Sequence, residues 1–164
     1  MGELGRLGET AGRLLRARGE TIAVAESSSG GLISSCLLAV PGASTYFVAG
    51  GVIYTHKARE MFTDIEFKQH PGMRSSSEPY AALLAETMRR RMETTWGLAE
   101  TGAAGPQGNR YGDAAGHTCI ALSGPVTRVF TLETASRDRE ANMWRFTEAA
   151  LDALVEALDQ PMTA

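Results

Sequence analysis

The sequence predicts a single domain of the α/β class, and three observations support this prediction. The length of 164 residues suits one domain that buries a sizeable core. Short apolar, β-branched runs alternate with segments of helical periodicity, and turns rich in Gly or Ser separate them. The last helical segment carries a wide apolar stripe, which is typical of a helix that lies on a sheet face. We therefore interpret residues 1–164 as one domain.

Four elements are expected in the N-terminal third, and each has a local signal. Leucines at helical spacing predict a first helix that ends before Gly19, a residue suited to a left-handed C-cap. A short apolar run then predicts a strand, and a polar turn leads into a second helix. A second strand is rich in aromatic and β-branched residues, and Gly50-Gly51 inside it indicates a bulge or a close backbone approach. The expected elements are helix 4–18, strand 21–25, helix 32–40 and strand 46–54.

The remaining elements follow in the same alternation. The start signal Ser77-Glu78-Pro79 predicts a helix, and a strand after it ends in a second glycine-rich turn. Residues 123–125 separate two strand runs that are expected to form a hairpin. Ser136 is expected to cap the last helix. The expected elements are a short helix and loop within 55–74, helix 78–94, strand 96–100, strands 117–122 and 126–132, and a last helix reaching 158.

Composition and charge exclude several classes of protein. Sixteen Lys and Arg residues against nineteen Asp and Glu leave no positive excess for a nucleic-acid backbone, so no nucleic-acid partner is expected. No apolar run approaches the length of a membrane span and the N-terminus lacks an apolar signal region, so a cytoplasmic protein without a membrane partner is expected. Cys36 and Cys119 are too few for a disulfide framework, and the three histidines share no metal-binding spacing.

Two of the predicted strands end in turns dense in glycine and hydroxyl side chains, at residues 26–31 and 101–108. In open α/β sheets ligands lie beyond the carboxyl ends of the strands, so both turns are expected to face one crevice. Ser29, Gly30 and Gly31 precede a helix, where backbone N–H groups can hold a phosphate or an oxyanion. The alternative is that the serines only cap that helix.

Five short motifs stand out by their order and spacing. They are Ala25-Glu26-Ser27-Ser28-Ser29-Gly30-Gly31-Leu32, Val40-Pro41-Gly42-Ala43-Ser44, Gly51-Val52-Ile53-Tyr54, Ser77-Glu78-Pro79 and Thr101-Gly102-Ala103-Ala104-Gly105-Pro106. Together they resemble the C-terminal domain of the competence/damage-inducible CinA proteins, over about residues 4–158. That family includes the stand-alone nicotinamide mononucleotide deamidases.

The resemblance implies a three-layer α/β/α sandwich with a mixed β-sheet, a homo-oligomer, and hydrolysis of the carboxamide of nicotinamide mononucleotide to the acid and ammonia. It implies no metal, and no cofactor is expected. Ser27 is the implied nucleophile, assisted by Tyr54 and a lysine, and a serine hydroxyl does need a neighbouring base to become nucleophilic. The implied substrate-binding residues are Ser29, Gly30, Gly31, Thr101, Gly102 and Gly105 on the two turns, and Arg139 at the phosphate.

The sequence departs from the family pattern at the lysine. The family reads Tyr-Ser/Thr-Asn-x-x-Lys, whereas residues 54–59 read Tyr-Thr-His-Lys-Ala-Arg, which puts Arg59 at the lysine position. A guanidinium has no removable proton and cannot act as a general base. Three interpretations stay open: Lys57 or His56 supplies the base, Arg59 only orients and stabilises charge, or the pocket binds a ligand without turnover. Residues 113–118 also follow the family's Lys-Pro-Val-Gly-Thr-Val only loosely.

Two hypotheses follow for the function. The first is a pyridine-nucleotide amidohydrolase, and the second is a catalytically silent paralogue that binds a nucleotide or a partner protein through the same pocket. In either case we expect Ser27 at the end of the first strand, within hydrogen-bond reach of Tyr54 or of the cationic group that follows it. We also expect an anion near Gly30-Gly31 or residues 101–108, with Arg139 contributing charge.

Overall fold

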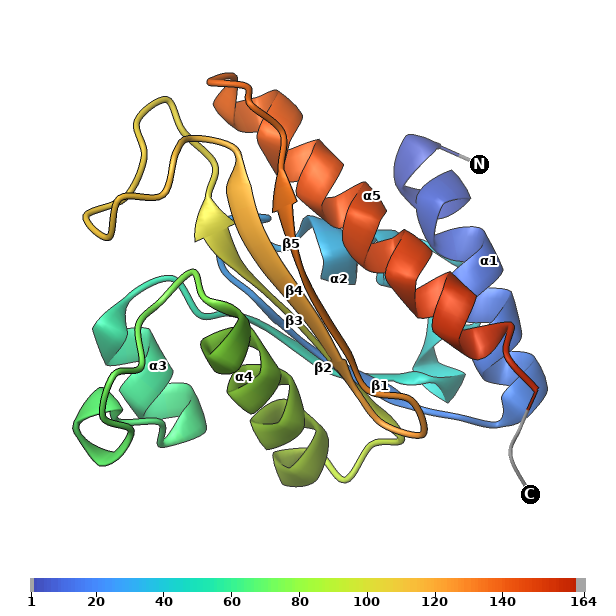
Figure 1. Ribbon diagram of the computed structural model, residues 1–164. Helices are drawn as coiled ribbons and strands as arrows, with labels where there is room; N and C mark the ends of the chain where they lie inside the picture. Colours follow the sequence, from blue (N-terminus) through green and yellow to red (C-terminus); the bar gives the residue numbers. More distant parts are fainter. Residues whose placement is uncertain (1, 162–164) are drawn as a thin grey trace.

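Within residues 2–161, which the computed structural model describes, five strands form a mixed sheet in the order β2-β1-β3-β4-β5 (Figure 1). β1 pairs in parallel with β2 and with β3, and β3, β4 and β5 continue the sheet as antiparallel neighbours. The predicted hairpin is therefore confirmed. The strands are β1 (Ile22–Glu26), β2 (Phe47–Val52), β3 (Trp96–Ala103), β4 (His117–Ser123) and β5 (Arg128–Glu133).

Helices cover both faces of this sheet, which confirms the three-layer α/β/α prediction (Figure 1). One face is covered by α1 (Glu3–Arg18), α2 (Leu32–Leu38) and α5 (Arg139–Leu158), and the other by α3 (His56–Thr63) and α4 (Glu78–Arg91). The core under α1 and α5 contains large side chains such as Trp96 and Leu154. The core under α4 contains small sheet residues such as Ala99 and Ala121, which bring that helix close to the sheet. No helix within residues 2–161 is both long and apolar enough to cross a membrane.

Most local signals place the elements correctly, and one does not. Gly19 adopts the left-handed conformation that ends α1, and Ser77 caps α4 by accepting from the Tyr80 amide. The prediction that Ser136 caps α5 is wrong, because the Asp138 side chain accepts from the Ala141 amide and the helix begins after it. Ser136 Oγ instead accepts from the Asp138 amide, one step earlier in the same turn.

The glycine pair of β2 marks a close approach. A Cβ on Gly50 would lie 2.3 Å from Ser34 Oγ, so a side chain here would clash with α2. The pairing of β1 with β2 shifts register between Ile22 and Ala23, whose partners are Phe47 and Ala49. The irregularity therefore falls at the start of β2, whereas the glycine pair accommodates the helix.

Candidate functional site

A pocket of about 290 Å³ opens at the carboxyl ends of the parallel strands β1 and β3, where both glycine-rich turns meet. The first turn contributes Ser27. Thr101 and Gly102 come from the end of β3, which runs to Ala103 and so extends past the predicted end of the strand at residue 100. The start of α3 and the loop after β3 close its sides. The other lining residues are Ile53, Tyr54, Thr55, His56, Arg59, Ser75, Ser76, Tyr80, Asn109, Arg110 and Tyr111.

Two buried glutamates organise the turn that carries Ser27. Glu26 and Glu100 end up side by side because they lie on the neighbouring strands β1 and β3, and neither side chain is exposed. Glu26 accepts hydrogen bonds from the amides of Gly31, Ile33 and Ser34 and from two serine hydroxyls. The backbone amides at the N-terminus of α2 therefore donate to the Glu26 carboxyl group and are not free to bind an external anion.

Glu100 holds the other half of the turn. Its carboxyl oxygens accept from the amides of Ser27 and Ser29 at 3.1 and 2.8 Å and from the hydroxyls of Ser28, Ser29 and Thr118. Ser29 Oγ lies 2.8 Å from Glu26 and 2.9 Å from Glu100, so its single proton serves one carboxyl group at a time.

These contacts correct the prediction that Ser29, Gly30 and Gly31 bind a substrate anion. Ser29 is fully buried and its polar groups are used by the two glutamates. The Gly30 amide donates to the Ser27 carbonyl oxygen at 3.2 Å, and the Gly31 amide donates to Glu26. The serines do not cap α2 either, because its N-cap is Gly31 and the amides of Ile33 and Ser34 in its first turn donate to Glu26. The segment is bound to its own glutamates.

Ser27 alone among the three serines reaches the pocket. Its side chain is half-buried, and within residues 2–161 its hydroxyl makes no hydrogen bond. The expected contact with Tyr54 does not form, since the exposed Tyr54 hydroxyl accepts from Arg139 Nη2 at 3.1 Å instead. Ser27 thus has the expected place at the end of β1 without the expected partner.

Arg59 is buried in the wall of this pocket, with 4% of its surface exposed. Its Nε donates to the Ile65 carbonyl oxygen at 3.0 Å, and its guanidinium lies 3.6 Å from the centre of the Phe67 ring. Tyr80 lies beside it, and burial raises the pKa of Tyr80 to about 12 although the positive charge of Arg59 opposes the shift. Lys57 lies two residues away on the exposed side of α3 and is not part of the pocket lining.

His56, the first residue of α3, borders the pocket with Arg110. His56 Nε2 is 3.1 Å from Arg110 Nη2, which also donates to the Tyr111 hydroxyl at 3.0 Å. Sequence reasoning left Arg110 out, because it lies 54 positions from His56 and no local pattern joins the two. The one local signal for a ligand-binding role of Arg110 was the dipeptide Arg110-Tyr111 between two glycines of the loop after β3.

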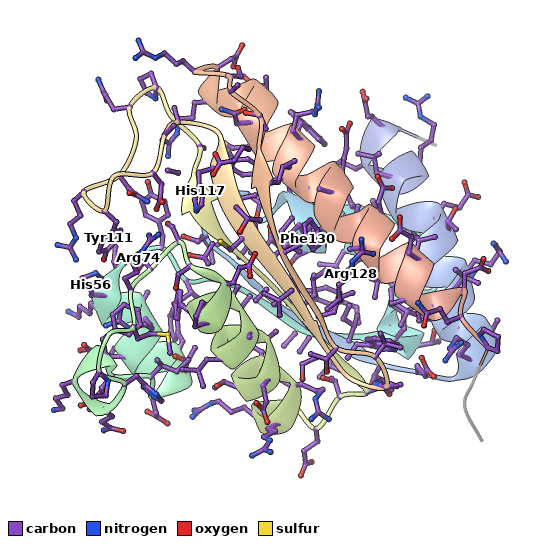
Figure 2. The ribbon with its side chains drawn as sticks, in the orientation of Figure 1. His56, Arg74, Tyr111, His117, Arg128 and Phe130 are labelled. Carbon is purple, nitrogen blue, oxygen red and sulfur yellow. The ribbon has the colours of Figure 1, made fainter. Side chains whose placement is uncertain are left out.

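A network of side chains supports the loop after β3 (Figure 2). Arg74 donates to both carboxyl oxygens of Asp113, at 2.6 and 3.1 Å, and its guanidinium faces the Tyr111 ring at 5.2 Å. Burial favours the neutral acid, but the hydrogen bonds from Arg74 and Asn109 outweigh it and lower the pKa of Asp113 below its ordinary value. Figure 2 shows His56, Arg74 and Tyr111 gathered on one side of the sheet end, near His117 on β4.

His117 fixes the segment before α4. Its Nε2 lies 2.9 Å from the carbonyl oxygen of Ser76, and its Nδ1 contacts Glu133. Burial disfavours the imidazolium, yet these two hydrogen bonds and the nearby Asp113 raise the pKa of His117 above its ordinary value. The Ser76 amide donates to Thr101 Oγ1 at 3.2 Å, so Thr101 helps to hold the pocket wall.

Arg139 lies at a smaller hollow of about 190 Å³ next to the Ser27 pocket. Its guanidinium donates to the Gly105 carbonyl oxygen at 2.6 Å and to the Tyr54 hydroxyl. The two hollows share Tyr54, Gly102 and Asn109. Gly102 needs to be glycine there, because a Cβ would lie 2.4 Å from the His117 carbonyl oxygen.

The permanently charged side chains that line the two hollows are all positive. Arg59 and Arg110 line the Ser27 pocket and Arg139 lines the hollow beside it, whereas no Asp or Glu lines either one among the described residues. No group of three or more His, Cys, Asp or Glu within residues 2–161 is arranged to hold a metal ion. The arrangement favours an anionic ligand next to a serine hydroxyl.

Known proteins are similar to this chain in sequence and in fold. A sequence profile described as the CinA C-terminal domain matches residues 5–158. A CinA-like protein of Desulforapulum autotrophicum is 36% identical over 146 residues, which cover 87% of this chain and 34% of that protein. A CinA-like protein of Chlorobium phaeobacteroides is 38% identical over 157 residues, which cover 93% of this chain and 37% of that protein. The chain thus spans about a third of the length of these curated relatives.

The fold agrees with a crystal structure of a CinA superfamily protein from Klebsiella pneumoniae. The two structures superpose with a TM-score of 0.88 at 23% sequence identity, over 96% of this chain and 98% of that chain. This likeness concerns the three-layer architecture, in which the carboxyl ends of β1 and β3 bear the pocket.

Proposed function

Because the chain belongs to the CinA C-terminal domain family, we propose that it is an amidohydrolase that acts on a pyridine nucleotide. The proposed reaction converts the carboxamide of nicotinamide mononucleotide to nicotinate mononucleotide and ammonia. The observation that carries the proposal is the position of Ser27, which follows β1 and opens into a pocket lined by two arginines and no acidic residue among those described.

Ser27 is the proposed nucleophile. Its Oγ bonds to the carboxamide carbon while its proton passes to a base, and the base returns that proton to the nitrogen as the C–N bond breaks and ammonia leaves. Water then attacks the ester carbon and gives one proton to the same base. The bond to Ser27 Oγ breaks, the base returns the proton to Oγ, and the acid is released.

His56 is the proposed base. It borders the same pocket as Ser27, whereas the exposed Lys57 lies outside that lining. Arg59 carries only donors, and the stack on Phe67 and the hydrogen bond to Ile65 hold its charge in the wall. We assign to Arg59 the stabilisation of negative charge that develops on the carboxamide oxygen.

Tyr54 and Arg139 form the proposed phosphate side of the site. Arg139 is the first residue of α5, and its guanidinium is aligned by the Gly105 carbonyl oxygen and the Tyr54 hydroxyl. A planar guanidinium suits the oxygens of a phosphate. Gly102 and Gly105 also line this hollow, and the absence of a side chain at both lets them pack against the carbonyl oxygens of His117 and Arg137.

A second candidate function is nucleotide binding without turnover. Two observations favour it. Within residues 2–161 the Ser27 hydroxyl donates no hydrogen bond to a base, and Arg59 stands at the position of the family's lysine. Catalytic hydrogen bonds often tighten only when the substrate binds, so this geometry leaves both functions testable.

Ammonia release from nicotinamide mononucleotide by the purified protein tests the proposed function. We expect turnover in the wild type and its loss in Ser27→Ala, with binding of the nucleotide retained in calorimetry. Since Ser27 contributes only its backbone amide and carbonyl groups to the hydrogen bonds of the turn, the alanine variant should unfold at the wild-type urea concentration. Tight binding with no ammonia from the wild type would establish the second candidate instead.

Self-association, which the family resemblance implies, is also part of this proposal. β2 is an edge strand, and its residues Val48 and Val52 are 50% and 44% exposed. Exposed edges with apolar side chains are suited to pairing with a second chain. Light scattering of the wild type and of Val48→Lys tests this part, and a monomeric wild type would refute it.

A further inference from the structure

Arg110 occupies the nitrogen of His56 that a general base needs. Arg110 Nη2 and His56 Nε2 are 3.1 Å apart at the rim of the Ser27 pocket. A guanidinium has donors only, so Nε2 is the acceptor and carries no proton in this contact. Its lone pair is therefore engaged by Arg110 and is not open to the proton of Ser27.

Arg110 is held loosely enough to be drawn elsewhere. Its side chain is exposed, and within residues 2–161 it pairs with no Asp or Glu. One nitrogen makes both of its hydrogen bonds, to His56 and to the Tyr111 hydroxyl, so the remaining N–H groups are open to a ligand. The Tyr111 ring, 5.1 Å away, gives the guanidinium a surface along which it can turn.

We propose that an anionic group of the substrate draws Arg110 away from His56 and thereby frees Nε2 to accept the proton of Ser27. This inference rests on the proposed function, because it concerns the base of the same reaction. An anion competes well with a neutral imidazole, since it adds charge attraction and can accept two parallel N–H bonds from the fork of Arg110. A substrate without an anionic group leaves His56 engaged and the nucleophile without its base.

The positions of the two residues agree with this role. His56 stands where the family pattern has Asn, which has no general-base chemistry, and Arg59 stands where it has Lys. Both changes fall at the beginning of α3 and both side chains line the pocket. Compared with the family pattern, the chain lacks the lysine base at position 59 and has a histidine base at position 56, in the lining of the same pocket. This histidine contacts Arg110, a cation that can bind an anionic substrate.

The ¹⁵N resonance of His56 Nε2 tests the coupling without turnover. The chain has three histidines, so His70 and His117 serve as internal references and His56→Asn identifies the signal. Inorganic phosphate and then nicotinamide mononucleotide are added to wild type, to Arg110→Gln and to Arg137→Gln, a matched control whose exposed arginine lies outside the Ser27 pocket. We expect the His56 signal to move in wild type and control, and to be displaced already and unresponsive in Arg110→Gln.

Kinetics with a substrate that lacks the anion provide the second measurement. Wild type should hydrolyse nicotinamide riboside at least tenfold more slowly than the mononucleotide, and inorganic phosphate should accelerate the riboside reaction. Arg110→Gln should hydrolyse the riboside faster than wild type does and ignore phosphate. A general base contributes about 10²- to 10⁴-fold, which makes a tenfold change measurable.

The outcomes separate this inference from the proposed function. A His56 signal that moves through Arg110, in a protein that releases no ammonia, supports the coupling and refutes the proposed reaction. Ammonia release with a His56 signal that ignores bound phosphate, or that responds equally in Arg110→Gln, refutes the coupling and leaves the reaction standing. A riboside reaction that Arg110→Gln slows as much as the mononucleotide reaction also refutes the coupling.

Discussion

The two turns that border the Ser27 pocket are held by different kinds of contact. The turn at residues 27–31 is tied to Glu26 and Glu100, whose side chains are fully buried. The loop at residues 104–116 is tied through side chains that water reaches, such as Arg74 with Asp113. Buried polar networks resist rearrangement, whereas exposed pairs add little stability and rearrange readily. The nucleophile therefore lies on the fixed side of the pocket, and Arg110 lies on the adjustable side.

The largest effect is expected from breaking the fixed side. Glu100→Ala leaves four donors without their acceptor in a buried site, while the Ser29 hydroxyl keeps Glu26, so the free energy of unfolding should fall by about 3 kcal/mol or more. Urea denaturation measures this loss, with Glu9→Ala on the exposed face of α1 as the matched control. Equal midpoints for the two variants would show that the turn does not depend on the buried network.

The next effect concerns Arg139, which joins the loop after β3 to Tyr54. Arg139→Ala removes the guanidinium from the hollow beside the pocket, and the affinity for nicotinamide mononucleotide should fall about tenfold, or about 1.4 kcal/mol. Titration calorimetry of this variant beside Arg137→Ala measures the difference. If the affinity of Arg139→Ala for the nucleotide were unchanged, Arg139 would be a surface residue of α5 with no part in binding the phosphate.

A smaller effect is expected from the ion pair of the adjustable side. Asp113→Asn keeps the shape of the side chain and removes the charge that faces Arg74, so unfolding should be easier by about 1 kcal/mol. The exposed Asp152→Asn should leave the midpoint of urea denaturation unchanged. If Asp113→Asn lowered the free energy of unfolding as much as Glu100→Ala does, the two turns would not differ in how strongly they are held.

The smallest effect is a pH dependence at His117. Its folded-state pKa is raised, so its contribution to stability is full below the unfolded pKa of about 6.5 and is lost as the pH rises through the folded value. The groups that face it are Glu133, Asp113, Cys119 and the carbonyl oxygen of Ser76. The difference in unfolding free energy between wild type and His117→Gln should therefore shrink above neutral pH. A difference that is constant from pH 6 to 9 would contradict this assignment.

The sequence predicted the elements well because their signals are local. Gly19, Ser77 and the apolar stripe of α5 act within a few residues, and the structure has them in these roles. The motif from Glu26 to Gly31 was ambiguous because an anion site, a helix cap and a turn wrapped around glutamates all need serines and glycines. The answer depended on Glu100, whose contacts with this motif span 71 to 73 positions of the chain. The pairing of His56 with Arg110 was equally remote, since it depends on how the loop after β3 folds back over α3.

The hydroxyl protons around Glu100 have a consequence for how the turn can be observed. Ser28, Ser29 and Thr118 direct their hydroxyl groups to glutamate oxygens, and their exposed fractions are 4%, 0% and 0%. Such protons exchange with deuterated solvent only when the surrounding segment opens, so their exchange rates measure the local opening free energy of the turn that carries Ser27. The exchange rates of these hydroxyl protons can be measured without a substrate. Their comparison with the exchange rates of the amide protons in the sheet shows how often the Ser27 turn opens independently of the sheet.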